Sequence, residues 1–206
     1  MCRCHADVCG ARRLSRPCRT PSSPSLVARR GNVADWFQKQ IVELSTGGNA
    51  IHQQSGACYH GYMGVTTMRI VLDTNVLVSA LRSRNGASYA LVSALPDPRF
   101  RICLSVTLYA EWQAVLTRPE HLPPGADARM AIGFTRYLAS IAHLQDVHFL
   151  WRPFLRDPND DMVLECAVAS GANTIITHNV RDFARAASLG VKAKTPGQFL
   201  KTLKEK

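Results

Sequence analysis

The 206-residue sequence contains no apolar run of the roughly 18 residues that a membrane-spanning helix needs. Its basic start is not followed by the apolar stretch that a secretory signal peptide requires. No glycine-rich phosphate loop follows the first clear strand, which argues against a nucleotide-binding module. These absences favour a protein of the cytoplasm that does not contact a membrane.

Cysteine is unevenly distributed and shows no sign of a disulfide framework. Five of the seven cysteines precede Met68, and only Cys103 and Cys166 follow it, each inside an apolar segment. Free cysteines in such segments behave as small buried hydrophobic residues. The Cys-x-Cys-His start of the chain lacks the second ligand pair of a zinc site, so we expect no zinc there.

Acidic residues are outnumbered, and the formal net charge is +10. Eight basic and three acidic residues precede Met68, whereas 17 basic and 12 acidic residues follow it. The basic excess is therefore shared equally between the two parts of the chain. Such an excess is consistent with a polyanionic partner such as RNA.

Residues 1–67 do not resemble a folded domain. Arginine, proline, serine and cysteine dominate the first thirty residues, and residues 45–67 are rich in glycine and small polar residues. Only residues 33–44 show helical spacing, and a helix of that length is marginal on its own. We expect residues 1–67 to be a disordered leader, or a segment read from an upstream start codon, and residues 68–206 to be one domain.

From Met68 onward, short apolar runs alternate with segments of helical spacing. The runs predict strands at residues 69–73, 100–104, 147–150, 174–177 and 191–194. The spacing predicts helices at residues 76–81, 87–95, 106–116, 126–143, 162–170 and 196–203, and a short helix before Gly190. This alternation is typical of an α/β domain with a central parallel sheet flanked by helices.

Carboxylates recur just past strands and near helix starts. They are Asp73, Glu111, the pair Asp160 and Asp161, and Asp182. The carboxyl ends of parallel strands share one edge of the sheet, where open α/β sheets bind ligands. Each acid alone reads equally well as a helix cap or a solvated charge. Four such coincidences together favour a common site.

Clustered carboxylates repel one another unless a cation or a proton intervenes. Oxygen-only ligands suit Mg²⁺, and Mn²⁺ can substitute for it. Such a metal activates water for phosphodiester hydrolysis. No protein nucleophile is evident, and His178 lies in a loop where it could touch substrate.

The chain resembles a PIN domain over residues 68–203. The resemblance rests on I-V-L-D-T-N at 70–75, L-S-V-T-L-Y-A-E at 104–111, D-P-N-D-D-M-V-L at 157–164 and I-T-H-N-V-R-D-F at 176–183. The D-P-x-D-D form of the third motif resembles toxins of bacterial type II toxin–antitoxin systems, relatives of VapC. This resemblance implies an Mg²⁺-dependent ribonuclease that binds a cognate antitoxin and forms a homodimer.

The resemblance assigns roles to individual residues. The four acids that it implies as catalytic and metal-binding are Asp73, Glu111, Asp161 and Asp182, with Asp73 and Asp161 as the principal ligands. Asp160 and Asp157 are rivals to Asp161, because the register of the third acid is open by up to one turn.

The small polar residues that line the family's site are matched by Thr74, Asn75 and Thr177, and we expect these three and Asn179 to bind substrate. Many relatives carry an acid where this chain has Asn179, which weakens a second metal site, so we expect at least one metal ion.

Two other functions fit parts of the pattern. A catalytically inactive PIN scaffold that binds RNA or protein would share the fold, although retention of all four acids argues against it. A haloacid-dehalogenase-like phosphatase also begins with a strand followed by aspartate, but it needs a second aspartate where this chain has Asn75.

Overall fold

The structure is a computed structural model, and it describes residues 67–150 and 152–205. The leader expected over residues 1–67 lies outside the described residues except for Thr67. Within the two described ranges, no helix has both the length and the apolar character needed to cross a membrane.

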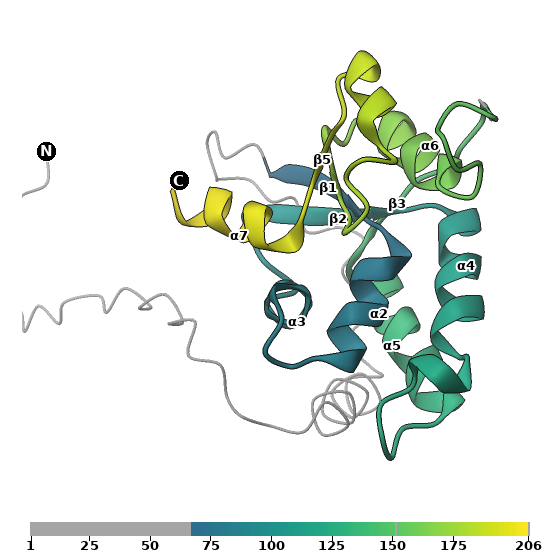
Figure 1. The fold of residues 1–206 in the computed structure, drawn as a ribbon, viewed down its shortest axis with the longest axis vertical. Helices are drawn as coiled ribbons and strands as arrows, with labels where there is room; N and C mark the ends of the chain where they lie inside the picture. The colour runs from purple at the N-terminus through teal and green to yellow at the C-terminus, as the bar shows by residue number, and fades with distance from the viewer. Residues whose placement is uncertain (1–66, 151, 206) are drawn as a thin grey trace, which may run out of the picture.

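Five parallel strands form the central sheet in the order β3-β2-β1-β4-β5 (Figure 1). Their bounds are β1 Met68–Leu72, β2 Phe100–Leu104, β3 His143–Leu144, β4 Thr174–Ile176 and β5 Lys192–Lys194. Every pairing between neighbouring strands is parallel, as the alternation of strands and helices predicts. The expected α/β fold class is confirmed.

Helices flank this sheet. The α-helices are α2 Thr74–Arg82, α3 Ala87–Ser93, α4 Val106–Leu116, α5 Ala128–Ile141, α6 Asp161–Ser170 and α7 Pro196–Lys204, and the 3₁₀ helices are η1 Pro119–His121 and η2 Ala184–Leu189. Figure 1 shows α6 on one side of the sheet and α2, α3 and α5 on the other. Both faces of the sheet are therefore covered.

Local sequence signals fix where several of these helices begin and end. Ser105 caps α4, because its hydroxyl accepts a hydrogen bond from the Leu108 backbone N–H. Gly171 ends α6 in the left-handed conformation at φ +66°, which glycine adopts without a steric penalty. Both boundaries agree with the positions that the sequence predicts.

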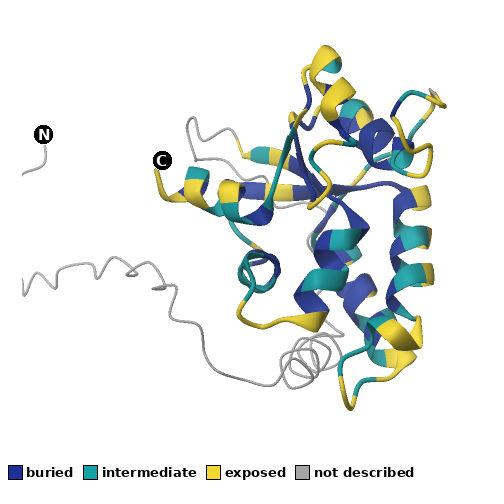
Figure 2. Ribbon diagram, in the orientation of Figure 1, coloured by how far each residue is buried: buried dark blue, intermediate teal, exposed yellow. Residues whose placement is uncertain are grey.

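The core is continuous between the sheet and the helices. Figure 2 shows the second half of β1 and much of α2 and α6 as buried. Ile70, Val71 and Leu72 are fully buried, as expected for a strand covered on both faces. Trp112 of α4 is also fully buried. Each side chain of this kind contributes roughly 1.5–3 kcal/mol when it is withdrawn from water.

The strand predicted at residues 147–150 is wrong. The third strand in sequence is β3 at His143–Leu144, and residues 145–150 have no regular secondary structure. β3 pairs with the last two residues of β2, and the Gln145 N–H still donates to the Leu104 carbonyl. Beyond Leu104 the neighbouring chain turns into α4, so residues 147–150 have no strand beside them.

The central strands bring two distant polar segments together. Leu72 of β1 is in register with Ile176 of β4, and the Asp73 N–H donates to the Ile176 carbonyl at 2.9 Å. Asp73 and Thr177, the first residues past these strands, consequently begin side by side at the carboxyl edge of the sheet.

Candidate active site

Asp73 is the most firmly held carboxylate at the carboxyl edge of the sheet. It caps α2, is only 5% exposed, and its Oδ2 accepts hydrogen bonds from Thr177 Oγ1 at 2.5 Å and from Asn75 Nδ2 at 2.6 Å. Asn75 Nδ2 also donates to Thr177 Oγ1 at 3.1 Å. Burial raises the pKa of Asp73, and hydrogen bonds from the Thr177 hydroxyl and from the backbone N–H groups of Asn75 and Thr74 offset part of the rise. Asp73 therefore caps α2 and is also part of the candidate site.

Glu111 of α4 lies near Asp73 and Thr74. Its Oε2 atom is buried without a hydrogen-bond partner among the described residues, and so is the Thr74 hydroxyl. Burial raises the pKa of Glu111, and the charge of Asp73 raises it further. The nearby Thr74 hydroxyl lowers this pKa. A buried acceptor of this kind is costly unless it serves a ligand.

Asp160 has the most perturbed carboxylate. It occupies the N-cap of α6, but its side chain makes no capping hydrogen bond. Burial, followed by the charges of Asp73, Asp157, Asp182 and Glu111, raises the pKa of Asp160 to about 7. Because each of these charges acts on it, Asp160 lies among the acids. We call Asp73, Glu111, Asp160 and Asp182 the carboxylate cluster.

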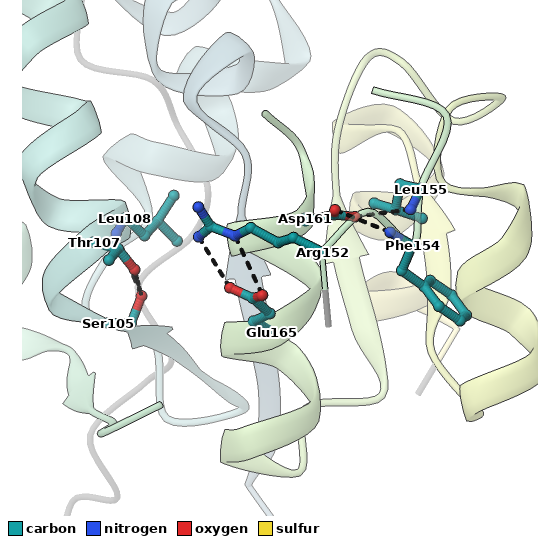
Figure 3. A network of polar contacts seen from close by, with 8 residues as sticks. All are labelled: Ser105, Thr107, Leu108, Arg152, Phe154, Leu155, Asp161 and Glu165. Carbon is teal, nitrogen blue, oxygen red and sulfur yellow. Dashed lines mark hydrogen bonds and ion pairs between the residues drawn. The ribbon is translucent and has the colours of Figure 1, made fainter. Parts of the chain in front are cut away.

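Asp161 is placed differently from its neighbour. Its side chain is 1% exposed and accepts hydrogen bonds from the backbone N–H groups of Phe154, at 3.0 Å, and Leu155, at 2.8 Å (Figure 3). Both carboxylate oxygens are thereby engaged in holding the segment that precedes α6. Of the rivals for the third acid, the geometry favours Asp160 over Asp161.

A second acid of α6 holds the same preceding segment. Glu165, one turn beyond Asp161, forms a two-point ion pair with Arg152, with N–O distances of 3.1 and 3.3 Å (Figure 3). We call residues 152–155 the strap. The strap is thus fastened to α6 by two carboxylates, each of which has donors of its own.

The remaining predicted site residues lie at the rim of the cluster. Asp182 is partly buried, and its charge acts on Asp160. Asp157 is exposed and accepts a hydrogen bond from the Asn159 N–H at 2.9 Å. Asn179 is exposed, and its N–H donates to Thr177 Oγ1 at 2.9 Å.

The structure adds one pair that the sequence does not single out. Ser88 of α3 is 3% exposed, and its Oγ is hydrogen-bonded to His178 Nε2 at 2.8 Å. The two residues are 90 positions apart, so no local pattern connects them. The bond places the His178 imidazole beside the residues that orient Asp73.

The acids suit a divalent metal by their chemistry rather than by a preformed cage. Within residues 67–150 and 152–205, no three acidic, histidine or cysteine side chains converge closely enough to hold an ion. Mg²⁺ keeps several waters and is usually bound by one or two carboxylates, so a closed cage is not required. The unpartnered Glu111 oxygen and the raised pKa of Asp160, a penalty that a cation would remove, both fit such an ion.

The sequence matches the model of a known protein family. A family model described as the PIN domain matches residues 69–181, just over half of the chain. The matched span includes Asp73, Glu111 and Asp160, and it ends one residue before Asp182. No curated protein matches the chain.

Proposed function

Because the chain belongs to the PIN domain family, whose members are typically metal-dependent nucleases, we propose that it is an Mg²⁺-dependent ribonuclease that hydrolyses phosphodiester bonds. The observation that carries this proposal is the carboxylate cluster, in which the charges of Asp73, Glu111 and Asp182 act on Asp160 and that of Asp73 acts on Glu111. Folding a domain around such repulsion is costly, and a bound cation repays that cost.

The ligands that we propose are Asp73 and Asp160, with Glu111 and Asp182 completing the negative site. A bound Mg²⁺ or Mn²⁺ would supply Lewis-acid activation of water and neutralise charge on the phosphate. Asp161 does not join this set, because both of its oxygens are engaged by the strap. The Asp157 carboxylate, exposed at the rim, adds negative charge near Asp160.

The small polar residues divide into two roles in this proposal. Thr177 is fully buried and, together with Asn75, fixes the orientation of the Asp73 carboxylate. Thr74 is 5% exposed and faces Glu111. Only Asn179 is exposed, so it is the one of the four that is free to contact RNA directly. The hydrogen bonds from Thr177 and Asn75 keep the Asp73 carboxylate oriented before substrate arrives.

We further propose that the protein is the toxin of a toxin–antitoxin pair, that it binds a cognate antitoxin and that it forms a homodimer. The support is the D-P-N-D-D form of the third motif, which resembles VapC-like toxins. The competing function is a catalytically inactive scaffold that binds RNA or protein.

The deciding experiment is cleavage of a mixed, structured RNA pool by the purified protein in Mg²⁺, in Mn²⁺ and in EDTA. The variant is Asp73→Asn, and the matched control is Asp97→Asn, an acid that precedes β2 and so lies toward the opposite edge of the sheet. We expect metal-dependent cuts by the wild type and the control, and a loss of at least about 10²-fold in Asp73→Asn.

Circular dichroism would verify that both variants are folded. Undiminished cleavage by folded Asp73→Asn would overturn the site assignment. If the wild type binds RNA and Mg²⁺ but cuts nothing in the pool, the scaffold function is favoured.

A further inference from the structure

His178 is an exposed residue beside the carboxylate cluster. It directly follows Thr177, whose hydroxyl donates to Asp73, and it is exposed. Although burial dominates the raised pKa of Asp73, His178 is close enough to oppose that rise electrostatically. The imidazole is therefore both near the central acid and open to solvent.

Two hydrogen bonds fix the position of this residue. Its backbone N–H donates to Asn75 Oδ1 at 3.2 Å, which anchors the loop whatever side chain it carries. Its ring nitrogen Nε2 is 2.8 Å from the hydroxyl of Ser88. Ser88 is almost completely buried, so the exposed His178 is held by a buried partner on α3.

The second ring nitrogen, Nδ1, makes no hydrogen bond with any described residue. A serine hydroxyl can donate or accept, whereas a phosphate oxygen only accepts. Two arrangements of the ring place a proton on Nδ1: Ser88 donates to Nε2 of a neutral ring, or Ser88 accepts from Nε2 of a protonated ring. In both arrangements Nδ1 is a donor for an anionic oxygen.

Building on the ribonuclease function proposed above, we infer that His178 donates from Nδ1 to a backbone phosphate of the bound RNA, and that Ser88 is the positioning residue for this ring. A donor at the rim offsets the repulsion between the acids and the phosphates that flank the cleaved one. Phosphate contacts of this kind position the substrate without reading its sequence.

The two amide variants of His178 separate the roles of its ring nitrogens. In His178→Asn the amide nitrogen takes approximately the place of Nδ1, and in His178→Gln it takes that of Nε2. We expect His178→Ala and His178→Gln to raise KM about tenfold with kcat changed less than about twofold. His178→Asn should stay within about twofold of wild type in both constants.

Ser88→Ala should raise KM about threefold, because the ring keeps its donor but loses its fixed orientation. The matched control is Ser93→Ala on the same helix, since the Ser93 hydroxyl donates only to the Ala90 carbonyl. The control should leave KM and kcat unchanged. A merely structural role for Ser88 would instead lower the unfolding midpoint and kcat together.

Equilibrium binding of labelled RNAs of several sequences, measured by fluorescence anisotropy in EDTA, supplies a readout independent of cleavage. We expect His178→Ala to weaken binding by a similar factor for every sequence. Loss confined to particular sequences would overturn the phosphate contact in favour of a base contact. Unchanged KM and binding in His178→Ala, or rescue by glutamine rather than asparagine, would overturn the inference as well.

The two proposals fail separately. If the wild type does not cleave, the ribonuclease function fails, while anisotropy still decides whether His178 binds RNA phosphate. If the wild type cleaves and all His178 variants match it, only the inference fails.

Discussion

The two acids of the strap region and two acids of the carboxylate cluster are held by the fold in opposite ways. In the strap region, Asp161 and Glu165 are each matched with donors: two backbone N–H groups for one and an arginine for the other. Among the described residues, Glu111 has a buried oxygen without a hydrogen-bond partner, and Asp160 makes no capping hydrogen bond while the charges of four other acids act on it. The strap acids hold the structure together, whereas Glu111 and Asp160 carry a cost of burial and repulsion.

The comparison is sharpest between Asp160 and Asp161, which are identical in chemistry and adjacent in sequence. Asp160 is the N-cap of α6 and Asp161 is its first residue, so their side chains leave the helix start in different directions. One side chain meets the donors of the strap and the other meets the acids. Of these two neighbours, Asp160 is the one whose oxygens no described residue engages through a capping hydrogen bond.

The largest expected effect is on catalysis, and it tests this contrast directly. Asp160→Asn should lower kcat/KM for RNA cleavage in Mg²⁺ by about 10²-fold, because it removes the charge of a proposed metal ligand. Asp161→Asn makes the same chemical change one residue away and should retain activity per folded molecule. The measurement is the initial cleavage rate, normalised to the folded fraction from circular dichroism. If Asp161→Asn lost more activity than Asp160→Asn, the third metal-binding acid would be Asp161.

The same pair of variants should reverse its order in stability. Asp161→Asn should lower the free energy of unfolding by about 2–3 kcal/mol, since an amide can accept only one of the two buried N–H bonds well. Asp160→Asn should leave that free energy unchanged or raise it, because it removes a repelled charge. Urea denaturation in EDTA measures both. Equal losses in the two variants would show that the structure treats the two acids alike.

A smaller effect is expected at the ion pair of the strap. Glu165→Gln should lower the free energy of unfolding by about 1 kcal/mol, a modest value because Arg152 is partly exposed and screened by solvent. It should leave the cleavage rate of the folded protein unchanged, which urea denaturation and cleavage assays would show together. Loss of cleavage without loss of stability would show that Glu165 belongs with the acids of the carboxylate cluster rather than with those that hold the strap.

Much of this arrangement could be predicted from the sequence. Helical and strand periodicity located β2 and α4 to the residue, and the rule that parallel strands share a carboxyl edge explains why Asp73 and Thr177 meet. Such features are encoded locally or follow from topology. They need no knowledge of side-chain direction.

The choice between Asp160 and Asp161 could not be predicted in the same way. It depends on where the strap places the N–H groups of Phe154 and Leu155, seven and six residues before Asp161, and no periodicity shows that. The contact between Ser88 and His178 is likewise set by how α3 packs beside the loop after β4. The strand predicted at residues 147–150 failed because apolar composition does not reveal whether a neighbouring strand extends far enough to pair.

The smallest expected effect is the pH dependence of stability in the absence of metal. The pKa of Asp160 is about 7 in the folded protein against an ordinary value of 3.8, so the folded state binds more protons than the unfolded chain between these limits. The free energy of unfolding in EDTA should therefore fall as pH rises from about 4 to about 7. Asp73 and Glu111 shift in the same direction.

Asp160→Asn should flatten this slope by about 1 kcal/mol over the window, a value well below the full 1.36 kcal/mol per pKa unit because Asp160 is partly exposed. Asp97, whose pKa is lowered because the hydrogen bonds and charge of Arg99 outweigh its burial, acts mainly below pH 4 and leaves the window undisturbed. Urea denaturation at pH 5, 6 and 7.5 would measure the slope. A wild type that becomes more stable as pH rises through this window would mean that the cluster acids already have cationic partners within the protein. The contrast between the cluster and the strap would then be lost.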